Sequence, residues 1–132
     1  FEKNDLLPFE AGIDAGAQAV LVSHNIVACL DADYPASLSP AVHALLRDRL
    51  GFDGVIMTDD LAMQAVTDFT GDENAAVLAV QAGNDLIISS DFVTQYHAVL
   101  DAVKNGTLRK NDIEQAAQHV ILWKIQLGLI SF

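Results

Sequence analysis

Short apolar runs alternate with helix-compatible segments along this chain. The apolar runs are rich in Val, Leu and Ile, as buried strands usually are, and cover residues 19–23, 54–58 and 85–89. Helices are predicted at residues 4–16, 40–50, 72–82 and 92–104, and from 111 or 112 to 127. Asn4, Ser39 and Asp91 are the predicted caps of three of these helices, with a rim contact as the alternative for Asp91, and Asn111 or Asp112 is the predicted cap of the last. Ser39 is followed by Pro40, which favours a helix start at that position.

This alternation predicts an α/β fold with a parallel sheet and right-handed crossovers. Each predicted strand ends in polar residues, at 23–25, 58–60 and 89–91. The carboxyl ends of parallel strands meet at one edge of a sheet, where active sites form. Three parallel strands leave their outer edges unpaired, so we expect the chain to be part of a larger fold.

Two adjacent carboxylates follow the second strand. The apolar residues 55–57 are succeeded by Thr58, Asp59 and Asp60, and a helix-compatible sequence then begins. One aspartate is explained by capping of that helix, but the second is explained less easily. The pair therefore marks a candidate active site.

The composition of the chain argues against several classes of partner and cofactor. The chain of 132 residues has 18 acidic residues against 7 basic ones, which argues against nucleic acid as a partner. No apolar run approaches the roughly 18 residues that a membrane span requires. The single Cys29 excludes an internal disulfide and a cysteine-based metal site. The acids and histidines lack metal-ligand spacing, so neither a metal nor another cofactor is expected.

The longest motifs resemble glycoside hydrolase family 3. Residues 31–40 read Asp-Ala-Asp-Tyr-Pro-Ala-Ser-Leu-Ser-Pro, and Leu46-Arg47 follows. Residues 50–63 then read Leu-Gly-Phe-Asp-Gly-Val-Ile-Met-Thr-Asp-Asp-Leu-Ala-Met. Within the family, these motifs are similar to the β-N-acetylhexosaminidase branch, and the similarity extends over nearly the whole chain.

The resemblance implies a fold and an activity. Members are (β/α)8 barrels that release terminal β-linked N-acetylglucosamine with retention of configuration, acting on peptidoglycan fragments or chitin-type sugars in the cytoplasm or at the cell envelope. The family's nucleophile falls on Asp59, which would form a glycosyl-enzyme that water resolves. Asp60, His24 and Met63 are the expected substrate-binding residues. For His24, a structural hydrogen bond to a neighbouring loop is an equal alternative, as packing is for Met63; Asp60 is alternatively a cap or an orienting group.

The chain also departs from the family pattern. Members of this branch carry a Lys-His-Phe-Pro-Gly-His-Gly segment and an Asp-x-His loop that supplies the acid/base histidine, and neither is present here. We therefore expect residues 1–132 to be a single partial domain, about three βα units from the C-terminal portion of the barrel. Such a segment would be inactive alone and would need the rest of the barrel, or another copy of the chain, as its partner.

Other activities remain open at this point. A β-glucosidase of the same family usually has Trp directly after the nucleophile, where this chain has Asp60. A phosphorylase would differ in the missing acid/base loop. A receiver-like signalling domain is a remote alternative. Such domains place the acid pair after the first strand and a lysine after the last, whereas here the pair follows the middle strand and no lysine follows residues 89–91. His43, His97 and His119 lie in predicted helices and are expected to face solvent or pack helices.

Overall fold

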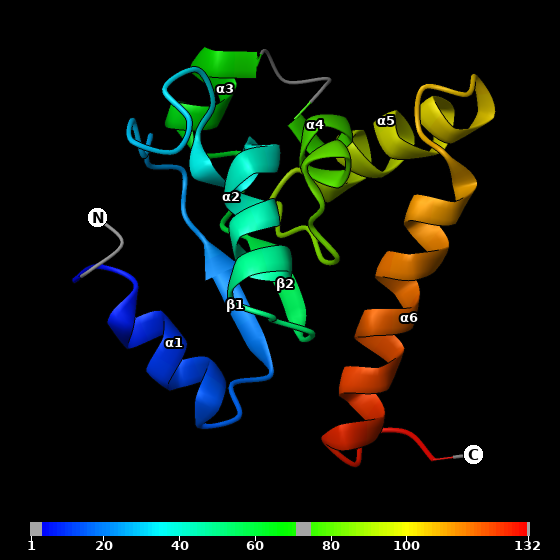
Figure 1. Cartoon of the computed structure of the whole chain (residues 1–132). Helices are drawn as coiled ribbons and strands as arrows, with labels where there is room; N and C mark the ends of the chain where they lie inside the picture. Colours follow the sequence, from blue (N-terminus) through cyan, green and yellow to red (C-terminus); the bar gives the residue numbers. More distant parts are fainter. Residues whose placement is uncertain (1–3, 71–74, 132) are drawn as a thin grey trace.

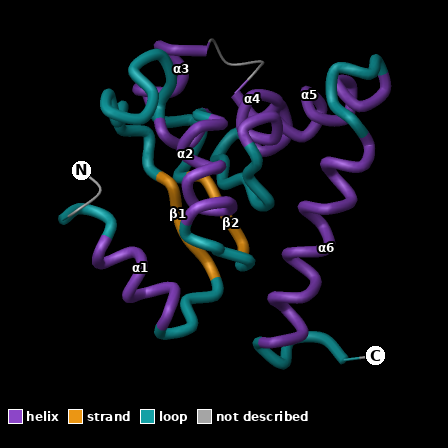
Figure 2. The backbone as a smooth tube through the Cα atoms, viewed as in Figure 1, coloured by secondary structure: helices purple, strands orange, loops and turns teal. Residues whose placement is uncertain are grey.

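A small parallel sheet lies at the centre of the described chain. β1 (Ala19–Val22) and β2 (Val55–Thr58) pair in parallel, with Ala19 opposite Val55 and Val22 opposite Thr58. Figures 1 and 2 show the two strands side by side, with helices around them. The structure is a computed structural model that describes residues 4–70 and 75–131. The parallel pair confirms two of the predicted strands and the α/β class.

The third predicted strand, residues 85–89, is wrong as a full strand. It makes only an isolated parallel bridge, between Met57 and Leu86. The backbone N–H groups of Asp85 and Leu86 both donate to the carbonyl of Ile56, and the N–H of Ile88 donates to the hydroxyl of Thr58. The carbonyl of Ile56 is thus used twice, and a side-chain hydroxyl accepts where a backbone carbonyl would in a regular parallel ladder. The segment therefore runs parallel to β2 but does not add a strand to the sheet.

Helices form most of the remaining described structure. They are α1 (Leu7–Asp14), α2 (Pro40–Ala44), α3 (Gln64–Thr70), α4 (Ala75–Ala82), α5 (Phe92–Lys104) and α6 (Lys110–Gln126). A 3-10 turn, η1 (Ala36–Leu38), precedes α2, and a π-helical segment, η2 (Leu45–Arg49), continues it. α3 corresponds to the helix-compatible sequence after Asp60, whereas the predicted start of α4 at residue 72 lies outside the described residues. The predicted cap of α6, Asn111 or Asp112, is wrong: the helix begins at Lys110, and Arg109 occupies the cap position with no side-chain bond to the helix.

Local signals at the helix ends agree with the structure in some places. The Ser39 side chain accepts the N–H of Val42, which confirms it as the cap of α2. Gly51 and Gly83 follow helices with φ of +63° and +110°, a region that glycine adopts without strain.

The predicted cap Asn4 is wrong, whereas Asp91 takes its predicted position without bonding a backbone N–H of the helix. α1 begins after Leu6, with no side-chain cap and with Pro8 in its first turn. A start at Asn4 would place Pro8 where a helical N–H is needed, and proline has none. Asp91 does occupy the cap position of α5, but its carboxylate accepts the hydroxyl of Thr94 at 3.0 Å instead of a backbone N–H.

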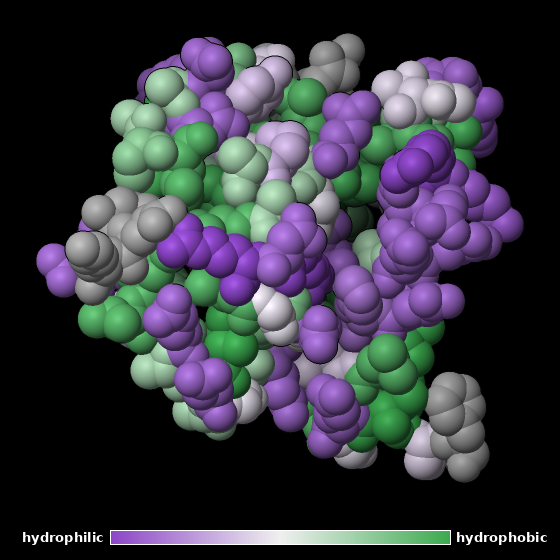
Figure 3. Space-filling model, in the orientation of Figure 1, coloured by the Kyte–Doolittle hydropathy of each residue, from purple (hydrophilic) through white to green (hydrophobic). Residues whose placement is uncertain are grey.

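The core surrounds the two strands and α4. Buried side chains from β1, α2, η2 and β2 form one apolar cluster, and α4 joins a second cluster with Leu38, Leu61 and Val66. The side of the molecule formed by α1 and β1 is less well covered. Leu7 and Phe9 on α1 and Leu21 on β1 are each more than half exposed. Figure 3 shows hydrophobic groups at the surface on the α1 side and again towards the end of α6. Within residues 4–70 and 75–131, no helix has the length and hydropathy that a membrane crossing requires.

Candidate active site

Asp59 stands at the carboxyl end of β2. Its backbone N–H donates to the carbonyl of Val22 at 3.2 Å, which carries the pairing with β1 one residue past the strands. Its Oδ1 accepts the backbone N–H of Asp60 at 2.8 Å. Among the described residues, nothing donates to Oδ2. Asp59 thus has one carboxylate oxygen oriented by the backbone and a second that is available to a ligand.

The carboxylate of Asp60 is held by the protein instead. Its Oδ1 accepts the backbone N–H groups of Ala62 and Ser90, each at 2.9 Å. These two hydrogen bonds, Ala62 first, lower the pKa of the Asp60 carboxyl from its ordinary value, since both favour the charged form. Asp60 therefore closes the turn after β2 and ties it to the segment that follows residue 88.

His24 follows β1 and contacts two other parts of the same edge. Its Nδ1 lies 2.7 Å from the hydroxyl oxygen of Ser37, and its Nε2 lies 3.1 Å from the carbonyl oxygen of Asp60. Both ring nitrogens are thus engaged by protein atoms. The structure brings His24, Asp59 and Asp60 together, as the sequence predicted.

Met63 lies just before α3. Its N–H donates to the carbonyl of Asp60 at 3.0 Å, and its carbonyl accepts the N–H groups of Val66 and Thr67. Its side chain is 46% exposed. Met63 is therefore anchored by its backbone, while its thioether side chain is open to contact.

Sequence reasoning missed Ser37 as a member of the site. Ser37 is fully buried; its N–H donates to the carbonyl of Ser23, and its own carbonyl accepts Nδ2 of Asn84 at 2.7 Å. The available signal was its place in the Pro-Ala-Ser-Leu-Ser-Pro motif, residues 35–40. The second serine of that motif, Ser39, caps α2 and also donates its hydroxyl to Asp31 at 2.6 Å.

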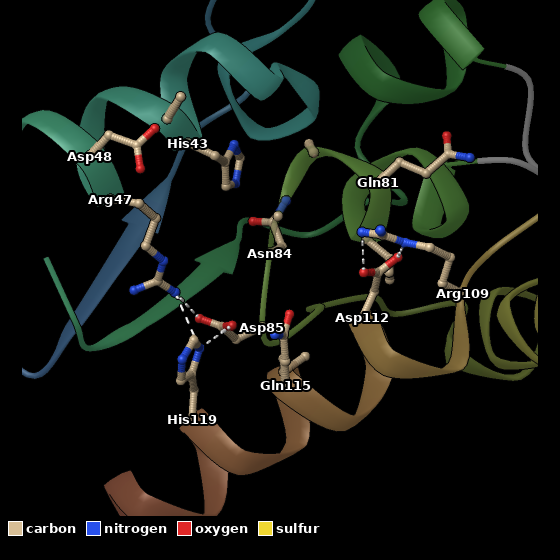
Figure 4. A pocket seen from close by; sticks show the side chains of 15 residues that line it. His43, Arg47, Asp48, Gln81, Asn84, Asp85, Arg109, Asp112, Gln115 and His119 are labelled. Atoms are coloured by element: carbon tan, nitrogen blue, oxygen red, sulfur yellow. Dashed lines mark hydrogen bonds and ion pairs between the residues drawn. The ribbon is translucent and has the colours of Figure 1, made fainter.

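A second polar cluster lies near the amino end of β2, away from Asp59. The Asp85 carboxylate accepts Nη2 of Arg47 and the N–H of Ile56, and its other oxygen lies 2.7 Å from Nδ1 of His119. Figure 4 shows these side chains converging from η2, from the segment after α4 and from α6. They line a cavity of about 360 Å³ that also includes the buried His43 and none of the predicted site residues. The cluster joins α6 to the sheet, which fits the helix-packing role expected for His119.

The chemistry available at the Asp59 end of the sheet is that of one accessible carboxylate on a rigid turn. Asp60 is committed to backbone hydrogen bonds, so the two aspartates are not equivalent. Over the described ranges, no group of three or more histidine, cysteine, aspartate or glutamate residues has the arrangement of a metal site.

Comparison with known proteins identifies the family. The family model described as "Glycosyl hydrolase family 3 N terminal domain" matches residues 1–122. A β-hexosaminidase of Xylella fastidiosa is 39% identical over 88 residues, which is 66% of this chain and 26% of that protein. A periplasmic β-glucosidase of Salmonella typhimurium is 30% identical over 132 residues, covering 97% of this chain and 17% of that protein.

Solved structures agree with these relatives. A family 3 β-N-acetylglucosaminidase from Paenibacillus superposes with a TM-score of 0.87 at 33% identity, covering 96% of this chain and 25% of the other. The chain therefore spans about a quarter or less of the length of each of these three proteins. On this sequence and structural similarity, the chain belongs to glycoside hydrolase family 3, in its hexosaminidase branch.

Proposed function

We propose that this chain supplies the nucleophile, Asp59, of a retaining glycoside hydrolase that releases terminal β-linked N-acetylglucosamine. The observation that carries the proposal is the unequal use of the two aspartates at the end of β2. Asp60 is bound by two backbone N–H groups, whereas Oδ2 of Asp59 has no described donor. The similarity to a β-hexosaminidase and to a β-N-acetylglucosaminidase supports the choice of sugar.

In this mechanism the Asp59 carboxylate attacks the anomeric carbon and the bond to the leaving group breaks. The covalent glycosyl-enzyme is then hydrolysed by water, which regenerates the carboxylate and keeps the β configuration. The hydrogen bond from the Asp60 N–H holds Oδ1 and thereby orients Oδ2. The exposed side chain of Met63 is available to line the sugar site from the start of α3.

We further propose that the chain works as about three βα units of a (β/α)8 barrel. The parallel pairing of β1 and β2, the parallel bridge at Leu86 and the exposed side chain of Leu21 on β1 support this arrangement. The remaining strands of the barrel, or another copy of the chain, would cover those edges. The similarity to a β-N-acetylglucosaminidase structure over a quarter of that chain is consistent with a partial barrel.

The segment alone is expected to be inactive. The resemblance assigns the acid/base histidine to a loop that these 132 residues do not contain. Positioned acid–base catalysis is worth roughly 10² to 10⁴-fold, and the loss of further sugar contacts removes more transition-state binding. Turnover of a p-nitrophenyl N-acetylglucosaminide by the isolated chain at rates near those of a complete enzyme would contradict this expectation.

A β-glucosidase is the second candidate, because the periplasmic β-glucosidase matches almost the whole chain. Asp60 argues against it, since the β-glucosidases of the family usually have Trp after the nucleophile. Rates with p-nitrophenyl N-acetyl-β-glucosaminide and with p-nitrophenyl β-glucoside, measured on the protein that completes the barrel, would separate the two.

Covalent trapping tests the nucleophile directly. A 5-fluoro glycosyl fluoride of N-acetylglucosamine forms a slowly hydrolysed glycosyl-enzyme, and peptide mapping then locates the sugar. We expect the label on Asp59 and its loss in Asp59→Asn. Asp53→Asn is the matched control, because Asp53 is an exposed carboxylate just before β2. A label on Asp60 or on any other residue would overturn the assignment.

A further inference from the structure

His24 joins three segments at the carboxyl edge of the sheet. It follows β1, its Nδ1 contacts the hydroxyl of Ser37 thirteen residues later, and its Nε2 contacts the carbonyl of Asp60 thirty-six residues later. These two contacts, at 2.7 and 3.1 Å, span the space between η1 and the turn after β2. The ring therefore bridges two loops that have no sequence proximity.

The acceptor at Nε2 determines which tautomer the neutral ring adopts. A backbone carbonyl oxygen can only accept a hydrogen bond, so Nε2 must carry a proton. In the neutral ring Nδ1 then holds a lone pair, and the hydroxyl of Ser37 donates to it. The geometry thus selects the Nε2–H tautomer of His24.

Ser37 provides a rigid anchor for this arrangement. It has no exposed surface, its N–H donates to the carbonyl of Ser23 at 3.1 Å, and its carbonyl accepts Nδ2 of Asn84. Asn84 is itself buried, and its Nδ2 also donates to the carbonyl of Ala79 within α4. Ser37 is therefore held by the residues that follow β1 and α4, and its hydroxyl fixes His24 in turn.

The far side of the bridge is the residue that orients Asp59. Asp60 donates its N–H to Oδ1 of Asp59 and accepts the bond from His24 at its carbonyl. Its carboxylate is held by Ala62 and Ser90 at the same time. Loss of the bond to His24 would leave the Asp60 carbonyl with the N–H of Met63 as its single described partner, in a residue whose N–H sets the angle of the Asp59 carboxylate.

We propose that His24 is a positioning residue that holds Asp59 in its reactive orientation through the Asp60 carbonyl, without a hydrogen bond of its own to the sugar. This inference rests on the proposed function for its kinetic consequence, whereas the tautomer and the bridge do not depend on it. Both ring nitrogens of His24 are used within the protein, so no polar atom of the ring remains for a substrate hydroxyl. The Pro-Ala-Ser-Leu-Ser-Pro motif, residues 35–40, contributes to this positioning, because its Ser37 fixes the His24 ring that holds the Asp60 carbonyl.

Three substitutions at one position test the proposal in the protein that completes the barrel. The terminal amide of Gln reaches about as far as Nε2 of histidine, whereas that of Asn reaches only as far as Nδ1. His24→Gln keeps a donor for the Asp60 carbonyl, while His24→Asn and His24→Ala lose it. His97→Ala is the control, because His97 lies on α5 and contacts Tyr96 at the surface.

We expect His24→Asn and His24→Ala to lower kcat by roughly 10- to 100-fold, because small misplacements of a reacting group cost rates of this size. KM should change by less than about threefold, since no substrate contact is removed. His24→Gln should stay within about threefold of the parent kcat, and His97→Ala should match the parent in both constants. A rise in KM with kcat unchanged, equal losses in the Gln and Asn variants, or no loss in any variant would each overturn the proposal.

Nitrogen-15 NMR of the histidine rings provides a test that does not depend on activity. The neutral His24 ring of the unsubstituted protein should carry its proton on Nε2 and none on Nδ1. The opposite tautomer would overturn the bridge even in an active enzyme. A protein without β-glycosidase activity but with the Nε2–H tautomer would instead refute the proposed function and leave the bridge intact.

Discussion

Oδ1 of Asp60 accepts the backbone N–H of Ser90 at 2.9 Å, although the two residues are thirty positions apart in the chain. The bond connects the turn after β2 to the end of the third parallel segment. Because that segment adds only one bridge to the sheet, a side-chain carboxylate holds its polar end in place. Asp60 is therefore part of the framework on which Asp59 rests.

Substitution of Asp60 by Asn should make stability less dependent on acid pH. Hydrogen bonds from Ala62 and Ser90 lower the pKa of Asp60 below its ordinary value of 3.8. A carboxyl group whose pKa is lower in the folded state stabilises the protein at pH values above its unfolded-state pKa. This contribution is lost as the pH falls through the pKa of the folded state. The difference in free energy of unfolding between wild type and Asp60→Asn should thus be largest near neutrality and shrink below about pH 4.

Urea unfolding at several pH values would measure this difference. Asn25→Ala is a suitable control, because it changes an exposed side chain at the same edge without removing a carboxyl group. A wild-type advantage over Asp60→Asn that stays constant from pH 7 to pH 3 would contradict the prediction.

Arg47 should be worth more to stability than any exposed arginine. Its Nη1 donates to the carbonyls of Phe52 and Gly54, both at 2.7 Å, and its Nη2 binds the buried carboxylate of Asp85. Arg47→Ala should lower the free energy of unfolding by roughly 2–4 kcal/mol, because it leaves a buried carboxylate without its cation. Arg47→Lys should recover only part of this, since an ammonium group cannot reproduce the fork of donors.

Arg109→Ala is the matched control for this cluster. Arg109 is 81% exposed at its side chain and pairs with Asp112 on the surface. Exposed pairs of this kind contribute about 0–1 kcal/mol. Equal losses for Arg47→Ala and Arg109→Ala in urea unfolding at one protein concentration would show that the Asp85 cluster is not a stabilising centre.

Two glycines should respond to alanine in opposite ways. A Cβ at Gly54 would fall against the carbonyl oxygen of Gln18 and the ring of Phe52, both closer than packing allows. Gly54→Ala should therefore destabilise the protein by at least about 1–3 kcal/mol. A Cβ at Gly12 meets nothing within 4 Å, and Gly12 lies inside α1, so Gly12→Ala should stabilise by about 0.5–1 kcal/mol. Thermal unfolding of the two variants would decide, and a neutral Gly54→Ala would contradict the packing at the start of β2.

The isolated 132-residue chain should self-associate. The side of the molecule beside β1 exposes Leu7, Phe9 and Leu21, and a parallel strand with an unpaired edge is a template for further pairing. Sedimentation at low micromolar concentration should show oligomers or aggregates. A cooperatively unfolding monomer would mean that these edges are stable when uncovered, and it would argue against the partial barrel.

The sequence by itself determined the local features. Ser39 before Pro40, and the glycines at 51 and 83, marked the ends of helices, because caps and positive φ values depend on neighbouring residues. The apolar residues 55–57 before Asp59 placed the candidate nucleophile at a strand end, since a buried strand is readable from its hydrophobic pattern. The family motifs in residues 31–63 identified the branch to which the chain is similar.

Only the tertiary structure decided what the polar residues of the edge do. The two partners of His24 lie 13 and 36 residues away, and Ser90 lies 30 residues from Asp60. No pattern along the chain specifies which carbonyl or hydroxyl a ring nitrogen will meet. The same holds for the third apolar run. Its composition is that of a strand, but the hydroxyl of Thr58 and the doubly used carbonyl of Ile56 limit it to one bridge. Hydrogen bonds between distant segments depend on how the elements pack, and packing is a property of the folded chain.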